Sequence, residues 1–402
     1  MKILLINKFH SPHSGADMYY MKLGAHLESL GHEVAYFAMQ HSQNQRTPWE
    51  RFFVSGRDFS SVHRNPIDAF SLFIRMLWSL EAQKKLEELL TVFKPDIAHV
   101  HNIYHHLSPS ILPVLHKHGI PVVMTAHDFK LVGPHYELPP HEHLVDRYFY
   151  TIRHRSMKDS TLASIAIVLE TMFHRMLRVY PKHIRKVFTA SHFLAKILRK
   201  HSGFHPSQIV ELPLGVERQG FLEFPVRSGF IYAGRLVEGK GLEWLIQTWR
   251  EQRFPHTLTI VGSGPIETEL HRLAEGLPIV FTGFLSHDET LKLMARSRCL
   301  IAPSTIPETF GLSAMEALSV GTPVIAAASG ALSENVQHGS NGYLVDPEQP
   351  SSLGQKILGF LSDPQKEYDM REQACISAKR FTWEQHLSQL LQEYASLLTP
   401  RL

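Results

Sequence analysis

Two glutamates lie eight positions apart, on either side of a point where a loop is expected to become a helix. Glu308 and Glu316 flank "FGL" within "IPETFGLSAMEALSVGTPVIAA" (306–327). Pro307 ends the preceding apolar run, and the first N–H groups of a helix have no partner inside the helix. Those N–H groups attract an anion, but a carboxylate beside a bound phosphate repels it. We therefore expect each glutamate to contact sugar hydroxyls: Glu316 a ribose, and Glu308 a sugar beyond a diphosphate.

A second loop carries two cations at a spacing that suits a diphosphate. "AGRLVEGKG" (233–241) follows an expected strand and opens an expected helix, with Arg235 and Lys240 five positions apart. Fixed cations at the carboxyl end of a strand, beside a helix N-terminus, bind phosphate groups well. Gly234 would let the backbone pass close to such a ligand. "VGSGP" (261–265) repeats the strand–glycine–helix pattern, which alone is a weak signal. The alternative interpretation of the two cations is an ordinary solvated surface.

Strands and helices alternate through both halves of the chain. "KILLIN" and "VAYFAM" are expected strands around a helix in which Tyr19, Leu23 and Leu27 recur at helical spacing. "FSLFIRMLWSLEAQKKLEELLTVF" (70–93) predicts one long amphipathic helix. This alternation predicts two doubly wound α/β domains with parallel sheets and a ligand site at the carboxyl ends of the strands, in a cleft between the domains. The expected divisions are a first domain over 1–212, a second domain over 213–380 and a C-terminal helix over 381–402.

Length and composition describe an ordinary globular chain of more than one domain. Of 402 residues, 44% are apolar and 20% are charged. That length predicts two domains of roughly 150–200 residues each. Cys299 and Cys375 belong to no C-x-x-C pair, so neither a disulfide framework nor a structural zinc site is expected. "MKILLINKF" is too short for a signal peptide, and no apolar run approaches the roughly 20 residues of a membrane span. A cytoplasmic location is expected.

The net charge of +3 is unevenly distributed along the chain. Residues 151–201 hold eleven Lys and Arg against two acids, Asp159 and Glu170, a local charge of +9. This run is either a solvated surface or a patch for anionic lipid head groups or an anionic acceptor. Nucleic acid is disfavoured, because the segment carries no nucleic-acid-binding motif. Among 27 histidines, His99 and His101 would share one face of a strand, but no third ligand is apparent and no metal site is expected.

The motifs together resemble a known family. "GRLVEGKG" followed by "PETFGLSAMEALSVGTPVIA" resembles the retaining glycosyltransferases of family 4, which have the GT-B fold. The resemblance places that family's pair of glutamates on Glu308 and Glu316, and its diphosphate-binding pair on Arg235 and Lys240. "SGADMYYMKLGAHLESLGHEV" is similar to the family's N-terminal glycine loop, helix and strand. "TAHDF" matches the segment with a histidine near the reacting sugar, here His127, and "FTWEQHLSQLLQEY" matches the last helix.

The resemblance implies that 1–212 binds the acceptor, that 213–380 binds the nucleotide-sugar donor and that the helix over 381–402 crosses back to the first domain. It also implies a set of site residues. The catalytic group would be Glu308, His127, Arg235 and Lys240. The donor-binding group would be Gly15, Gly234, Arg235, Lys240, Gly262, Gly283, Phe310, Gly311, Leu312 and Glu316. Two features depart from the family: Ser14 replaces the first of two adjacent N-terminal glycines, and the insert after "HDF" lacks the cysteines that many relatives carry.

The resemblance also implies an activity. A sugar would move from a UDP- or GDP-sugar to an acceptor hydroxyl with retained anomeric configuration, through an oxocarbenium-like transition state and with neither metal nor cofactor. In the family, the leaving phosphate is expected to accept the acceptor's proton. The acceptor would be lipid-linked or a surface polysaccharide precursor, which allows peripheral attachment to the inner face of the cytoplasmic membrane. The alternatives are a nucleotide-sugar epimerase or a phosphorylase, although no segment indicates the pyridoxal phosphate lysine of the latter, and a non-catalytic sugar-nucleotide-binding protein.

Overall fold

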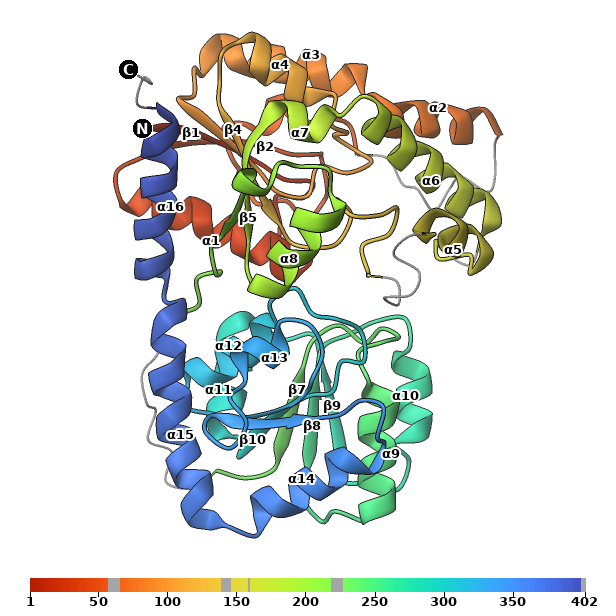
Figure 1. The fold of residues 1–402 in the computed structure, drawn as a ribbon, viewed down its shortest axis with the longest axis vertical. Helices are drawn as coiled ribbons and strands as arrows, with labels where there is room; N and C mark the ends of the chain where they lie inside the picture. Colours follow the sequence, from red (N-terminus) through yellow and green to blue (C-terminus); the bar gives the residue numbers. More distant parts are fainter. Residues whose placement is uncertain (57–65, 139–145, 158–159, 218–226, 399–402) are drawn as a thin grey trace. The chain divides into compact units, whose positions relative to one another are not determined.

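The chain folds into two compact units (Figure 1). The computed structural model describes residues 1–56, 66–138, 146–157, 160–217 and 227–398. Unit 1 comprises Met1–Ala190, Leu194–Leu212 and Gln389–Leu402, and unit 2 comprises Ser191–Phe193 and Pro213–Ser388. The last helix, α16 (Trp383–Leu398), therefore contributes residues to both units.

Unit 1 contains a six-stranded parallel sheet in the order β2-β1-β3-β4-β5-β6. Every residue of β3 and β4 is buried, as expected for a parallel sheet covered by helices on both faces. The strand order reverses between β1 and β3. The strands are β1 (Lys2–Ile6), β2 (Glu33–Phe37), β3 (Ile97–Val100), β4 (Val122–Ala126), β5 (Ile184–Thr189) and β6 (Ile209–Glu211). The helices are α1 (Gly15–Ser29), α2 (Pro66–Leu77), α3 (Leu80–Val92), α4 (Ile111–Lys117), α5 (Arg147–Arg153), α6 (Thr161–Met176), α7 (Val179–His183) and α8 (His192–His201).

Unit 2 repeats this arrangement with strands in the order β12-β11-β10-β7-β8-β9, and the order reverses between β7 and β10. The strands are β7 (Phe230–Ala233), β8 (Leu258–Val261), β9 (Ile279–Gly283), β10 (Cys299–Ala302), β11 (Val324–Ala327) and β12 (Gly342–Val345). The helices are α9 (Leu242–Gln252), α10 (Glu267–Leu273), α11 (His287–Arg296), α12 (Leu312–Ser319), α13 (Leu332–Asn335), α14 (Ser351–Leu361) and α15 (Pro364–Ala378). The predicted fold class, two doubly wound α/β sheets, is confirmed.

An aromatic cluster fixes α9 on the sheet of unit 2. Trp249 is fully buried, and its ring lies 5.4 Å from Phe230 of β7 and 5.1 Å from Phe254. The indole N–H of Trp249 donates to the carbonyl of His256 at 3.0 Å, so the buried polar atom is satisfied. This packing holds the start of α9 directly after the loop that carries the predicted cations.

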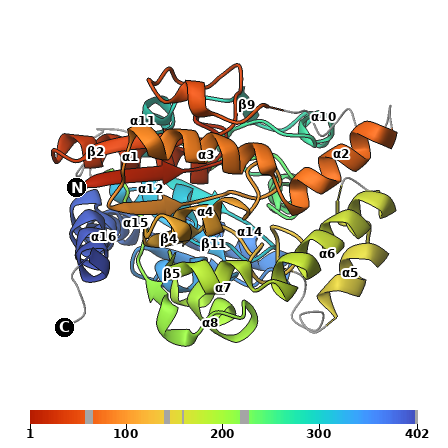
Figure 2. The ribbon, with the colours of Figure 1, turned by 90° about the horizontal axis from the view of Figure 1, so that it is seen from above.

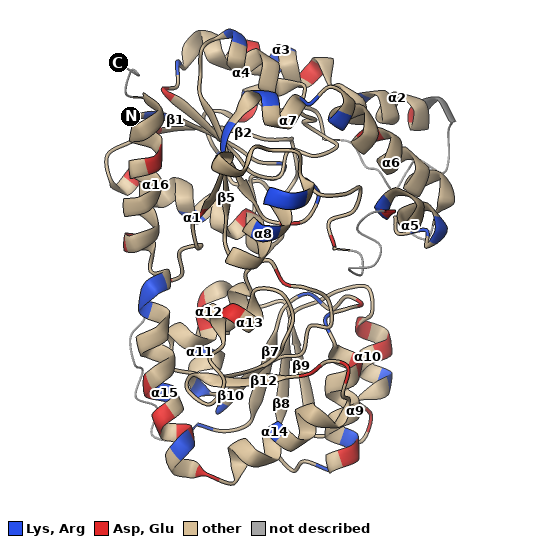
Figure 3. Cartoon of the chain, in the orientation of Figure 1, with Lys and Arg blue, Asp and Glu red and all other residues tan. Residues whose placement is uncertain are grey.

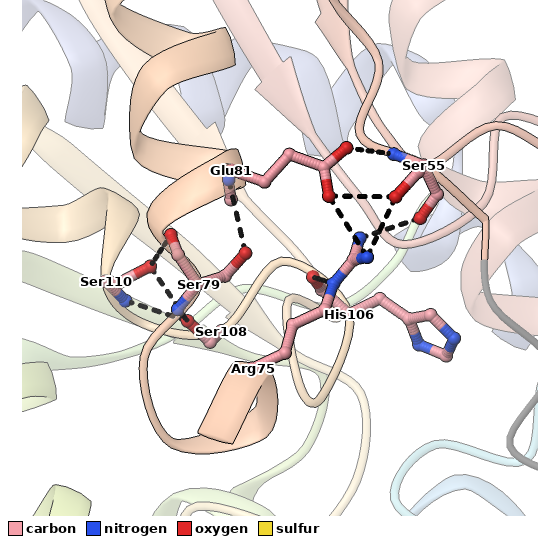
Figure 4. Close-up of polar contacts among 8 residues, drawn as sticks. Ser55, Arg75, Ser79, Glu81, His106, Ser108 and Ser110 are labelled. Carbon is pink, nitrogen blue, oxygen red and sulfur yellow. Dashed lines mark hydrogen bonds and ion pairs between the residues drawn. The ribbon is translucent and has the colours of Figure 1, made fainter. Parts of the chain in front are cut away.

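The predicted helix over 70–93 is wrong in one respect, because the structure breaks it into α2 and α3. Ser79 caps α3, accepting from the amide of Ala82 at 3.2 Å. Its own amide donates to Ser108 Oγ at 3.0 Å, and its carbonyl accepts from Ser110 Oγ at 3.0 Å (Figure 4). A serine that can cap a helix, with partners in a distant loop, outweighs continuous helical periodicity here. Among the described residues, no helix has both the length and the hydropathy to span a bilayer.

Candidate functional site

The predicted cations and Glu308 lie on the loops that follow β7 and β10, and Glu316 lies in α12, the helix after the second loop. These strands are neighbours in the sheet, and the strand order reverses between them. In doubly wound sheets, the loops at such a reversal leave in opposite directions, which is where ligands bind. Loop 234–241 leads into α9, and loop 303–311 leads into α12. The fold therefore brings the two sequence motifs to the same carboxyl edge of one sheet.

Lys240 and Glu308 form an ion pair across these two loops. The Nζ of Lys240 lies 2.5 Å from Oε1 of Glu308, and the two side chains are only 19% and 22% exposed. The amides of Thr305 and Ile306 donate to the carbonyl of Gly239 at 2.9 and 3.2 Å, which joins the same loops through their backbones. Sequence reasoning assigned Lys240 to a diphosphate and Glu308 to a sugar. The structure shows that the two groups are direct neighbours.

Glycines permit the close approach of these loops. Gly241 has φ of 72°, and a Cβ placed on it would lie 1.9 Å from the carbonyl oxygen of Pro303. Gly239 has φ of 78°, and a Cβ there would lie 2.7 Å from Cγ2 of Ile306. Side chains rarely adopt this left-handed backbone, so glycine is required both for conformation and for space.

The N-termini of α9 and α12 begin at these loops. Their N-cap residues, Gly241 and Gly311, are left-handed, and neither helix start receives a side-chain cap. At the other end of α12, the buried guanidinium of Arg227 donates to the carbonyls of Gly321 at 2.8 Å and Val320 at 3.2 Å. A cation at the C-terminus stabilises the helix dipole. The uncapped N-termini are suited to an anionic ligand.

Glu316 lies about one turn inside α12 and has a histidine neighbour. Its Oε1 is 3.4 Å from Nδ1 of His287 on α11, and both side chains are more than four-fifths buried. Sequence reasoning missed His287. The local signal there, Ser286 with Glu289 in a capping box, indicates a helix start and says nothing about Glu316.

Glycines directly after β7 and β8 and at the end of β9 form a second close contact. The amide of Gly262 donates to the carbonyl of Gly283 at 2.9 Å, and a Cβ on Gly262 would lie 1.9 Å from the carbonyl oxygen of Gly234. Gly262 has φ of 132° and Gly283 has φ of 69°. Beside them, Arg235 is exposed, and its carbonyl accepts from the hydroxyl of Tyr232 at 3.0 Å. The loop backbone is thereby fixed while the guanidinium remains accessible.

Phe310 and Leu312 differ in their surroundings although both belong to the predicted donor set. Phe310 is 2% exposed, and its ring packs edge-on against Phe381 at 5.5 Å. Its carbonyl accepts from Nδ2 of Asn335 at 3.0 Å. The buried side chain of Phe310 therefore packs loop 303–311 against unit 2. Leu312, at the first position of α12, is only half-buried.

In unit 1, the departure at Ser14 has a structural explanation. Ser14 is the N-cap of α1, and Gly15 is the first residue of that helix. Ser14 Oγ accepts weakly from the amide of Asp17 at 3.4 Å and donates to the Asp17 carboxylate at 2.7 Å. Asn7, directly after β1, donates to the other oxygen of Asp17 at 2.7 Å. A serine serves as an N-cap at least as well as a glycine, so the substitution preserves the helix start.

His127 follows β4 and contacts other aromatic rings of unit 1. Its Nε2 lies 3.1 Å from Nδ1 of His101, and the two rings stack at 5.4 Å. Burial lowers the pKa of His127 to about 3, so it is neutral at physiological pH. His99 contacts the hydroxyls of Tyr394 at 2.6 Å and Thr125 at 2.7 Å. The shared strand face of His99 and His101 thus serves hydrogen bonds and stacking, and the described residues hold no cluster of three or more potential metal ligands.

A buried ionic cluster that the sequence did not reveal lies after β3 and β4. Glu170 of α6 is 1% exposed and accepts from Nζ of Lys130 at 2.9 Å, while its other oxygen lies 3.0 Å from Nδ1 of His105. Lys130 also donates to the carbonyl of Pro134 at 2.8 Å. Burial raises the pKa of neighbouring Asp128 to about 6, although hydrogen bonds and the Lys130 charge oppose the rise. His105 has φ of 64°, a conformation that the surrounding contacts must maintain.

Two family profiles match the chain. The family described as Glycosyltransferase Family 4 matches residues 13–219, and Glycosyl transferases group 1 matches residues 222–377. The chain belongs to glycosyltransferase family 4. The family suggested by the sequence motifs is confirmed.

Curated relatives of this family 4 member match it over part of their length. An uncharacterised glycosyltransferase of Methanocaldococcus jannaschii is 33% identical over 162 residues, 39% of this chain and 40% of the relative. A GDP-mannose-dependent alpha-(1-6)-phosphatidylinositol dimannoside mannosyltransferase of Mycobacterium tuberculosis is 36% identical over 135 residues, 33% of this chain and 34% of the relative. The chain thus spans about 40% of the first relative's length and 34% of the second's.

Solved structures match over nearly the whole chain and show the GT-B fold. Sucrose-phosphate synthase from Thermosynechococcus elongatus has a TM-score of 0.71 at 20% identity, over 99% of both chains. An Anabaena protein solved with UDP and glucose has a TM-score of 0.65 at 19% identity, over 98% of this chain and 100% of that one. At such identities the likeness concerns the fold alone.

Proposed function

We propose that this family 4 member transfers a sugar from a nucleoside diphosphate sugar to an acceptor hydroxyl with retained anomeric configuration. The observation that carries the proposal is the Lys240–Glu308 pair at the strand-order reversal of unit 2, beside two uncapped helix N-termini. A fixed cation and free helix N–H groups suit a diphosphate. The carboxylates of Glu308 on the second loop and Glu316 in α12 suit the hydroxyls of the sugars at either end of that diphosphate.

In the proposed reaction, the bond between the anomeric carbon and the diphosphate oxygen breaks, and a bond to the acceptor oxygen forms. The acceptor's proton passes to an oxygen of the leaving phosphate. Arg235, Lys240 and the N-terminus of α12 would stabilise the charge that develops on the diphosphate. Glu308 would hold the transferred sugar and Glu316 the ribose. The role assigned to His127, a neutral hydrogen-bonding partner of the sugar, stays a prediction.

The ion pair modifies what each partner is expected to do. Without a ligand, Glu308 neutralises Lys240; when a diphosphate arrives, Lys240 would bridge it and Glu308. Removing Lys240 would then leave a carboxylate facing the phosphates and weaken binding twice, by a lost contact and by repulsion. Removing the Glu308 charge would leave the phosphate contact in place. The two substitutions should therefore have unequal effects on nucleotide binding.

Donor and acceptor are proposed from the names of relatives. One relative is GDP-mannose-dependent and acts on phosphatidylinositol dimannoside, and one structural neighbour was solved with UDP and glucose. We propose a UDP- or GDP-sugar donor and a lipid-linked or surface polysaccharide precursor as acceptor, with catalysis that needs no metal and no cofactor. A cytoplasmic location, and an anionic membrane as a partner of residues 151–201, stay predictions.

The test is calorimetric titration of UDP and GDP, together with release of nucleoside diphosphate from a panel of nucleotide sugars. Lys240→Ala should weaken binding about 10- to 100-fold, because a charge-assisted contact contributes about 1.5–3 kcal/mol. Glu308→Gln should reduce turnover far more than binding, and Glu316→Gln mainly binding. Arg272→Ala, which removes an exposed partner of Glu269 in the same unit, is the control. Unchanged nucleotide binding in both Lys240→Ala and Arg235→Ala would overturn the proposal.

Two of the alternative functions, the epimerase and the non-catalytic binding protein, give different outcomes in the same experiment. A non-catalytic sugar-nucleotide-binding protein would bind the nucleotide and release no diphosphate with any acceptor. An epimerase would convert one nucleotide sugar into another without releasing the diphosphate. Product analysis of the panel by mass spectrometry and chromatography therefore separates all three activities.

A further inference from the structure

Helix α6 of unit 1 buries several polar side chains beside Ile167 and Val168, and it leaves four large apolar side chains exposed. Leu162, Leu169, Met172 and Met176 are 81%, 48%, 51% and 73% exposed. Positions 162, 169 and 176 are two helical turns apart, and Met172 lies three or four residues from its neighbours, so the four share one face. We call these four residues the α6 stripe. A surface helix normally turns its apolar residues to the core and exposes polar ones, so a second apolar face that is exposed is unusual.

Polar contacts on the buried face of α6 account for the exposure of the stripe. It carries Glu170, which pairs with Lys130 and His105, and His174, whose Nε2 lies 2.9 Å from the carbonyl of Leu77 at the end of α2. Ser164 and Thr171 are buried on the same helix. These polar contacts fix the rotation of α6, so the stripe cannot turn inward without breaking a buried ionic cluster.

The neighbouring helix α2 follows the same pattern. Arg75 is 9% exposed and donates to the carbonyl of His106 at 3.2 Å and to Ser55 Oγ at 2.9 Å, and it pairs with Glu81 at 3.1 Å (Figure 4). Phe70 of α2 is nevertheless 66% exposed. Helices α2 and α5 both pack against α6, and the three lie together at one side of the unit 1 sheet in Figures 1 and 2. Two adjacent helices thus use buried polar contacts as anchors and leave apolar side chains outside.

Exposed arginines lie in the chain just before and just after α6, and the α6 stripe itself carries no charge. Arg153 and Arg155, at the end of α5, and Arg178, just after α6, are exposed. Figure 3 shows α6 itself largely free of charged residues and blue segments on α5. Two other basic residues of 151–201 interact with partners inside unit 1. Arg175 donates to the hydroxyl of Tyr148 at 3.2 Å, and Lys186 pairs with Glu393. Lys158 and Asp159 lie outside the described residues.

We propose that the α6 stripe is a docking face for an anionic lipid bilayer, with α6 lying in the plane of the membrane interface. An uncharged apolar stripe on a helix preceded and followed by exposed arginines fits an acyl layer beneath anionic head groups. The helix of 16 residues is about 24 Å long, which suits a position along the surface. The proposal goes beyond the charge of residues 151–201, because it assigns binding to apolar side chains and to three particular arginines. It does not depend on the proposed glycosyl transfer.

Co-sedimentation with phosphatidylcholine vesicles, with and without phosphatidylglycerol and at low and high salt, tests the proposal. The full chain should bind best to vesicles with phosphatidylglycerol. Leu169→Gln, Met172→Gln and Met176→Gln combined should lower the partition coefficient by about tenfold or more at both salt concentrations. Arg153→Gln, Arg155→Gln and Arg178→Gln combined should lower it by about ten- to hundredfold at low salt and less at high salt. The control pair, Leu30→Gln and Val92→Gln, changes exposed apolar residues elsewhere in unit 1 and should bind as the unchanged chain does.

A second measurement keeps the proposal testable if the triple variant folds poorly. Met172→Cys in a Cys375→Ser background, labelled with an environment-sensitive dye, should shift to bluer emission on adding vesicles with phosphatidylglycerol. The same label at Leu30→Cys should not shift. Three results would overturn the proposal: equal vesicle binding by the triple stripe variant, no blue shift at position 172, or a concentration-dependent dimer that the triple stripe variant dissociates. The last result would assign the stripe to a second copy of the chain.

Discussion

Units 1 and 2 build the same kind of sheet but hold the residues at its carboxyl edge by different means. In unit 2 the backbone does this: left-handed Gly239, Gly241 and Gly311 let loops approach to distances that no side chain allows. In unit 1, buried side chains do it, above all Glu170 with Lys130 and His105. One architecture can therefore position residues either through backbone conformation or through a buried polar network. The two should respond differently to substitution and to pH.

The largest expected effect is in unit 1. Glu170→Gln leaves the Lys130 ammonium buried without its carboxylate, and removing one partner of a buried pair costs about 3–5 kcal/mol in free energy of unfolding. Urea unfolding of the purified chain measures it. Glu87→Gln removes an exposed carboxylate that pairs with Lys117 and should cost about 1 kcal/mol or less. Similar losses for both variants would show that the network does not hold unit 1 together.

In unit 2, the corresponding test adds one methyl group to a glycine of the loop before α9. Gly241→Ala forces a side chain into a left-handed conformation and against the Pro303 carbonyl, which should cost roughly 2–4 kcal/mol and weaken nucleoside diphosphate binding. Gly359→Ala, in the interior of α14 with no atom within 4 Å of the new Cβ, should be neutral or stabilise by up to about 1 kcal/mol. If Gly241→Ala unfolds at the same urea concentration as the unchanged chain, the backbone explanation fails.

Acid should destabilise unit 1 through its buried histidines. Burial lowers the pKa of His10 to about 4 and that of His127 to about 3, whereas an unfolded histidine titrates near 6.5. The neutral histidines therefore contribute fully to the free energy of unfolding above pH 6.5. That contribution is lost as pH falls, by about 2 kcal/mol per histidine at pH 5. Asp128 acts in the opposite sense, because its raised pKa of about 6 makes the folded state bind a proton more tightly. The measurement is the unfolding free energy between pH 5 and 7, where His10→Gln should flatten the profile and Asp128→Asn should steepen it. A profile that His10→Gln leaves unchanged would contradict the assignment.

The smallest effect concerns the last helix. Lys186 of β5 pairs with Glu393 of α16, and both side chains are partly exposed. Such pairs contribute about 0.2–1 kcal/mol, so Lys186→Gln should lower the unfolding free energy within that range and less at high salt. A double-mutant cycle with Glu393→Gln isolates the pair. A coupling free energy as large as the loss predicted for Glu170→Gln would contradict the view that exposed ion pairs contribute less than buried ones.

Local sequence patterns predicted the sheets and the loop residues of unit 2, but not contacts between distant segments. Alternating strands and helices predicted both sheets, and local glycine loops pointed to Arg235, Lys240, Glu308 and Glu316. The sequence could not show that Lys240 pairs with Glu308, because 68 residues separate them and loop geometry alone joins them. The buried Glu170 cluster was invisible for the same reason.

Helical periodicity also has a limit of its own. It identifies a stripe of apolar residues, but it does not say whether that stripe faces the core. In α6 the buried face is determined by the contacts of Glu170 with Lys130 and His105, which belong to other segments of the chain. Similarly, the break between α2 and α3 depends on Ser108 and Ser110, about 30 residues from Ser79. Interactions between distant segments decided each feature that local patterns missed.

The hydrogen bond between Tyr394 and His99 has a consequence for synthesis of the chain. Tyr394 is fully buried in unit 1, and its hydroxyl contacts a histidine of the central strand β3. A ribosome releases most of unit 1 once Leu212 has emerged, yet Tyr394 follows about 180 residues later, a delay of roughly 10–40 s at ordinary elongation rates. During that interval the nascent sheet lacks part of its covering and is open to chaperones and proteases. Unit 2 has all of its residues by Ser388, so the second half of the gene product is expected to complete its fold before the first.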